Sequence, residues 1–69
     1  MEKTKFLNTC FTEEEWLTAF MLSRGEKIKT IAYKLSVSTR TVDRHIATLI
    51  RETGTHNRYQ AIAKLAKYI

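Results

Sequence analysis

Residues 39–53 combine charged and small side chains at helical spacing with an apolar opposite side. Arg40, Asp43, Arg44, Ala47 and Arg51 share the polar side. A guanidinium can donate two parallel hydrogen bonds to O6 and N7 of guanine, and a carboxylate can accept from N4 of cytosine. These residue types at this spacing therefore indicate recognition of a nucleic acid.

Four of these residues are candidates for reading bases: Arg40, Asp43, Arg44 and Ala47. Arg44 is the leading one, and its alternative roles are a phosphate contact or a solvated cation. Asp43 either accepts from cytosine or orients Arg40, three residues earlier, and we favour the orienting role. Ala47 is small enough to let the helix approach the groove and touch a thymine methyl group.

Phosphate contacts need cationic or hydroxyl side chains, which position a protein on nucleic acid without reading sequence. The candidates of this kind are Lys27, Lys29, Thr39, Thr41, Thr48, Arg51 and Arg58. Lys27 and Lys29 begin a helix that has no good cap residue, and each is unfavourable there by roughly 0.3–1 kcal/mol. A phosphate bound at that terminus would make the effect of these lysines on the helix favourable. The alternative is that the missing cap is a tolerated imperfection of the surface.

The elements that position these residues are two short helices joined by a tight turn. The first is expected at residues 27–35, the turn at 36–38, and the second at 39–53 with Ser38 as its cap. Apolar residues recur at helical spacing at Ile28, Ile31, Ala32 and Leu35, and again at Val42, Ile46, Leu49 and Ile50. The expected core stripe of the second helix is Val42, Ile46, Leu49 and Thr53. A helix-turn-helix follows.

A helix precedes this unit and another follows it. Thr12 and Glu15 form a capping box, Phe11 staples onto Trp16, and Gly25 ends the first helix after about Arg24. Its expected buried stripe is Trp16, Ala19, Phe20 and Ser23.

The last helix is expected from residue 58 towards Ile69, capped by Asn57 with Gln60 as the capping-box partner. One apolar arc should cover the core: Ala61, Leu65, Tyr68 and Ile69. A second arc is a candidate dimer interface: Tyr59, Ile62, Ala63 and Ala66. The alternative is that Tyr59 and Ile62 pack under the N-terminal residues.

Composition fits one small all-α domain. The chain has 69 residues, a formal charge of +5, no proline and two glycines. We expect residues 1–10 to be an N-terminal lead or linker remnant and residues 11–69 to be the domain. Two histidines and the single Cys10 give no metal spacing or internal disulfide, and no cofactor is expected. Nothing in the pattern indicates an enzyme or a membrane span.

The residues from Phe11 to about Ile62 resemble the C-terminal DNA-binding domain of the LuxR (GerE-type) regulators. The matching residues are Thr12, Glu15, Gly25, Lys29, Ile31, Ala32, Leu35, Ser38, Thr41, Val42, His45, Gly54, Arg58 and Ala61. The resemblance implies a compact four-helix domain whose third helix enters the major groove of duplex DNA. It also implies a homodimer that forms through the fourth helix. RNA polymerase is a further candidate partner. The protein is expected in the cytoplasm, at the nucleoid.

The chain departs from the family pattern at several positions. Asp43 stands where the family often has a lysine that meets DNA, so the target sequence should differ. Leu17 replaces a usual acid, and Lys27-Ile28 replaces a usual cap and polar residue. Trp16 and Phe20 are bulkier than the pattern leads one to expect.

Two other functions compete with this one. The first is a promoter-element-binding region of a sigma factor, although His45 and the Gly54, Arg58 and Ala61 spacing favour the LuxR type. The second is a helix-turn-helix relic that binds another regulator and no DNA. The arginines on the outer side of residues 39–53 argue against it. We expect His45 to be a packing or hydrogen-bonding residue, and His56 to be exposed.

Overall fold

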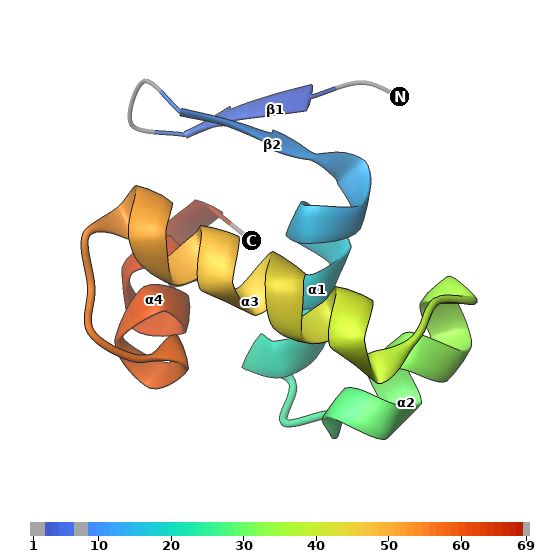
Figure 1. Cartoon of the computed structure of the whole chain (residues 1–69). Coiled ribbons are helices and arrows are strands. Elements are labelled where there is room, and N and C mark those ends of the chain that lie inside the picture. Colours follow the sequence, from blue (N-terminus) through green and yellow to red (C-terminus); the bar gives the residue numbers. More distant parts are fainter. Residues whose placement is uncertain (1–2, 7–8, 69) are drawn as a thin grey trace.

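The computed structural model describes residues 3–6 and 9–68, with side chains for residues 11–68. The helices are α1 (Glu13–Ser23), α2 (Ile28–Leu35), α3 (Thr39–Thr53) and α4 (Arg58–Leu65), followed by the 3₁₀ turn η1 (Ala66–Tyr68). The predicted all-α, four-helix fold is confirmed (Figure 1).

Helix α3 lies at the centre of the domain and packs against each of the other three α-helices (Figure 1). Two clusters of buried side chains result. One joins Phe11, α1, α3 and α4, and its fully buried members are Phe11, Ala19, Leu49, Ala61 and Leu65. The other joins α2 to α3 through Ile31, Ala32, Val42 and Ile46. Ile50 packs against both clusters and connects them.

The predicted helix-turn-helix is confirmed. Helix α2 ends at Leu35, and Ser36 takes a left-handed conformation with φ 57° and ψ 43°. The Val37 N–H then donates to the Ala32 carbonyl at 3.0 Å, and the Val37 side chain packs against the α2–α3 cluster. This left-handed residue is what lets the chain reverse within three residues, because it satisfies the last carbonyls of α2 while turning away from its axis.

Helix α1 begins as the sequence predicts but buries a different face. Thr12 and Glu15 form the capping box, and the rings of Phe11 and Trp16 meet edge-on at 5.6 Å. The expected buried stripe was wrong in part: Thr18 and Ala19 are buried, whereas Phe20 and Ser23 are exposed. The physical reason is that apolar residues occur on several sides of α1 between Trp16 and Leu22, so their spacing alone does not select the inner face.

Helix α4 is shorter than predicted. Asn57 caps it, but the Gln60 side chain accepts from the His56 N–H rather than from the cap residue itself. Ala61 and Leu65 are buried as expected, whereas Tyr68 is 48% exposed and Ile69 lies outside the described residues. Tyr68 leaves the predicted arc because a 3₁₀ turn advances about 120° per residue instead of 100°.

A two-stranded antiparallel hairpin precedes α1. Strand β1 (Lys3–Phe6) pairs with β2 (Thr9–Thr12), in a register that places Lys3 opposite Thr12. This hairpin was not predicted, because its strands are only four residues long and the strand-favouring residues of β2 fall in the expected N-terminal lead and the expected start of the first helix. Strand β2 contains the fully buried Phe11, which packs in the core and attaches this end of the chain to it. Among the described residues, no helix is long and apolar enough to cross a membrane.

Candidate DNA-binding surface

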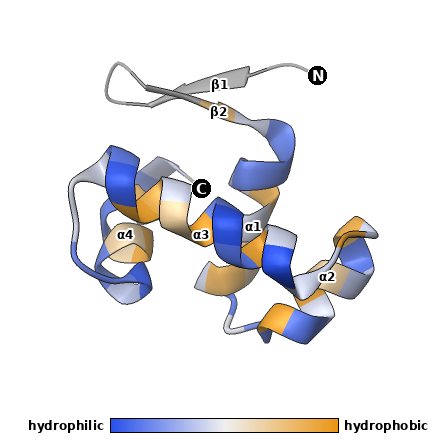
Figure 2. Cartoon of the chain, viewed as in Figure 1, coloured by the Kyte–Doolittle hydropathy of each residue, from blue (hydrophilic) through white to orange (hydrophobic). Residues whose placement is uncertain are grey.

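Helix α3 has one buried and one exposed face. Val42, His45, Ile46, Leu49 and Thr53 are buried against the other helices. The residues of the outer face are all exposed: Arg40, Asp43, Arg44, Ala47 and Arg51. The resulting alternation of polar and apolar segments along the helix is visible in Figure 2. A rigid helix thus presents its charged side to solvent, as entry into a groove requires.

Arg40, Asp43 and Arg44 are not paired with one another. Within the described part of the chain, no ion pair joins the Asp43 carboxylate to either guanidinium. Both side chains are exposed, and the orienting role of Asp43 towards Arg40 stays a prediction. All three remain available to an external partner.

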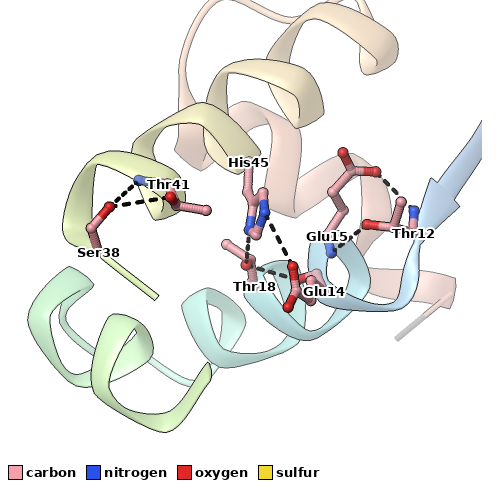
Figure 3. A network of polar contacts seen from close by, with 7 residues as sticks. All are labelled: Thr12, Glu14, Glu15, Thr18, Ser38, Thr41 and His45. Carbon is pink, nitrogen blue, oxygen red and sulfur yellow. Dashed lines mark hydrogen bonds and ion pairs between the residues drawn. The ribbon is translucent and has the colours of Figure 1, made fainter. Parts of the chain in front are cut away.

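A buried polar network fixes the rotation of α3 against α1 (Figure 3). His45 Nδ1 lies 3.1 Å from the Thr18 hydroxyl, and that hydroxyl lies 2.8 Å from the Glu14 carbonyl oxygen. The other ring nitrogen, Nε2, lies 3.8 Å from the Glu14 carboxylate. His45 is thus a hydrogen-bonding residue of the interior, as expected. The network links the buried side of α3 to α1.

The cap of α3 holds its first turn in place. The Ser38 hydroxyl accepts from the Thr41 N–H at 3.1 Å, and the two hydroxyls lie 3.1 Å apart (Figure 3). Arg40 and Thr39 stand in this turn, so the cap orders the backbone that carries them.

Helix α2 begins without a side-chain cap, as predicted. Lys27 is the cap residue and makes no capping hydrogen bond, and no acid stands in the first turn. Glu26, just before it, accepts from Lys34 Nζ at 2.8 Å, which ties the carboxylate to the last turn of α2. Lys27 and Lys29 are both exposed. The first turn therefore combines N–H groups that lack a side-chain partner with two cations, an arrangement that favours an anion.

The other phosphate candidates are unequal in exposure. Thr39 and Arg51 are exposed, whereas Thr41, Thr48 and Arg58 are half-buried. Arg51 is engaged with its neighbour Glu52 at 3.2 Å. Arg58 lies over the Tyr59 ring at 5.5 Å. It also lines, together with Lys27, a shallow groove of about 360 Å³ between the start of α2 and the start of α4.

Two residues of this region were missed by sequence reasoning. Tyr33, on α2, is 86% exposed and stands one helical turn after Lys29, a spacing that marks it as a neighbour on the same face. Lys64 donates from Nζ to the Thr53 carbonyl at 2.9 Å and so caps the end of α3. No local pattern indicates the second contact, because its partners are 11 residues apart.

The candidate dimer residues lie along α4 and η1. Tyr59 is 74% exposed, and Ala63 and Ala66 are exposed as well. Ile62 is half-buried and packs against the cluster that contains Phe11 and Leu49. Part of its apolar surface is therefore already used within the domain.

Residues 9–65 match the model of the bacterial regulatory proteins of the luxR family. The chain is 43% identical over 53 residues to the transcriptional activator protein AhyR of Aeromonas hydrophila, covering 77% of this chain and 20% of AhyR. The transcriptional activator protein AsaR of Aeromonas salmonicida gives the same values. The glycerol metabolism activator of Pseudomonas putida is 37% identical over 51 residues, covering 74% of this chain and 23% of the activator.

The chain thus spans only about a fifth of the length of these relatives. Within that part, the family match covers all four α-helices and the turn between α2 and α3. The chain belongs to the luxR family of bacterial regulatory proteins.

Proposed function

We propose that residues 11–69 form the DNA-binding domain of a transcription regulator, with residues 1–10 leading into it. In this proposal α3 lies in the major groove of a specific duplex site. The observation that carries it is the outer face of α3, where Arg40, Asp43 and Arg44 are exposed and form no ion pair with any described residue, while the opposite side of the helix is buried in the core.

Base reading falls to the middle of that face. Arg44 would donate to guanine, Asp43 would accept from cytosine N4, and Ala47 would let the backbone approach a thymine methyl group. Arg40, one turn earlier, lies where it can read a base or hold a phosphate. Asp43 repels phosphates as well as accepting from cytosine, so it should narrow the range of acceptable sites rather than add affinity.

Phosphate contacts would lie on both sides of the outer face of α3. Lys27, Lys29 and the N–H groups at the start of α2 would hold one strand, together with the Tyr33 hydroxyl. On the other flank the proposed contacts are Thr39, Thr41, Thr48, Arg51 and Arg58. Arg51 would have to release Glu52, which an exposed pair does at little cost.

Because the relatives are named as activators, we extend the proposal to activation at promoters, with RNA polymerase as a candidate contact. Pairing through α4 would place two domains on half-sites about one helical turn of DNA apart. Such a protein would act in the cytoplasm, on the nucleoid.

Selection of bound sequences from random duplexes, followed by titration at rising salt, tests the proposal. With about four to six phosphates neutralised per protomer, log K should fall with log salt at a slope near −0.9 per contact. A consensus that contains a G·C pair should emerge. Recovery of unselected sequences, or affinity unchanged between low and physiological salt, would refute it.

A further inference from the structure

We infer that α1 is a second self-association surface, separate from α4 and from the DNA-binding face, which pairs with α1 of another copy of this chain. The surface is the outer face of α1, made of Glu13, Leu17, Phe20 and Arg24. Its members recur at helical spacing along 11 residues of helix and its C-cap. The proposal does not depend on the proposed DNA-binding function.

This face is apolar where a small domain normally exposes charge. Leu17 is 36% exposed and Phe20 is 42% exposed, one turn apart in the middle of the helix. Trp16 and Met21, both half-buried, flank them on the two sides. A helix whose apolar residues continue around its solvent side is normally covered by something.

The charges of the face are complementary to a second copy of the same face. Glu13 stands at the first residue of α1 and Arg24 at its C-cap, so the apolar pair lies between one acid and one base. If two copies pair antiparallel about a two-fold axis midway along the helix, Glu13 meets the partner's Arg24, and Leu17 meets the partner's Phe20. Two-fold symmetry then repeats both contacts. A parallel pairing would instead oppose like charges at each end.

The Arg24 side chain is held near the position this pairing needs. Its guanidinium lies over the Phe20 ring at 5.6 Å, and its only ion pair in the described part of the chain is a 4.0 Å approach to Glu26. The side chain is 64% exposed. An ion pair to a second copy would therefore add to the contact with Phe20 rather than break a tight internal bond.

The pairing is compatible with the other surfaces of the domain. The inner face of α1 contacts the buried side of α3 through Thr18 and His45. The outer face of α1 therefore points away from the outer face of α3. A dimer formed through α1 therefore leaves the outer face of α3 free.

Sedimentation equilibrium of this chain over a wide concentration range tests the inference. One 11-residue helix makes a small interface, so the dissociation constant should be on the order of 0.1–1 mM. Glu13→Arg or Arg24→Glu alone should lower the association constant roughly tenfold, because symmetry applies each like-charge contact twice. The double variant restores opposite charges and should return most of the association.

Phe20→Asp and Leu17→Lys should each abolish the dimer, with circular dichroism confirming the fold of both exposed-site variants. Thr30→Glu, an exposed substitution on α2, is the control and should leave this equilibrium unchanged. A chain that stays monomeric at millimolar concentration would overturn the inference. So would a dimer lost in Ala66→Glu, at an exposed residue of the candidate α4 interface, but kept in Phe20→Asp. A double charge reversal that fails to recover association would overturn the antiparallel pairing.

Discussion

The Thr18 hydroxyl of α1 lies within hydrogen-bond distance of His45, on the buried side of α3. It lies within hydrogen-bond distance of both His45 Nδ1, at 3.1 Å, and the Glu14 carbonyl oxygen, at 2.8 Å. Thr18→Val keeps the shape of the side chain but removes this hydroxyl. The buried Nδ1 atom then loses its partner, because Glu14 faces the other ring nitrogen.

Leaving a buried polar atom unsatisfied costs about 1–3 kcal/mol. A domain of this size has only a few kcal/mol of net stability, so the loss is a large fraction of the total. At about 4–8 °C per kcal/mol, the melting temperature should fall by at least about 4 °C. Urea and thermal denaturation followed by circular dichroism would measure the change.

Thr30→Val is the matched control, because Thr30 is an exposed helical threonine with no hydrogen bond from its side chain in the described structure. It should change stability by less than about 0.5 kcal/mol. His45→Leu completes a double-mutant cycle: combined with Thr18→Val, it should cost less than the sum of the single changes, by about 1 kcal/mol. Equal stability of the Thr18→Val and Thr30→Val proteins would refute the reasoning.

Four further predictions concern the turn and the binding surfaces. Ser36→Gly should stabilise the fold by roughly 0.5–1 kcal/mol in urea denaturation. Glycine relieves the strain of the left-handed φ of 57°, and this gain exceeds the cost of a more flexible unfolded chain. A loss of stability would contradict this. Arg44→Ala should cost about 1–3 kcal/mol on the preferred duplex and relax one base pair, whereas Lys29→Ala should weaken all duplexes similarly, as fluorescence anisotropy on mutated sites would show. Asp43→Lys should strengthen non-specific binding and blur the selected sequence; an unchanged preference would show that Asp43 reads no base. Ala66→Glu, at an exposed residue, should abolish cooperative binding to paired half-sites while single-site affinity stays within about twofold, and undiminished cooperativity would place the dimer interface elsewhere.

The sequence by itself determined the helices of the helix-turn-helix and the faces of α3. Its helix caps, Thr12, Ser38 and Asn57, all accept the hydrogen bonds that the pattern predicts. The buried stripe of α3 was predicted correctly because charged and apolar residues alternate there with a clear helical period. These are local properties, which depend on residues within a few positions of each other.

Only the tertiary structure decided which side of α1 is buried, and with it the exposure of Phe20. When apolar residues occur on several sides of a helix, their spacing does not indicate which side is buried. Packing against the neighbouring helices then decides it. The Thr18–His45 contact spans 27 residues, and the Lys64 cap of α3 comes from another helix. The hairpin likewise depends on pairing between two four-residue strands and on the burial of Phe11, because segments this short give little local signal. Contacts between distant residues carry no periodic signal, so packing alone reveals them.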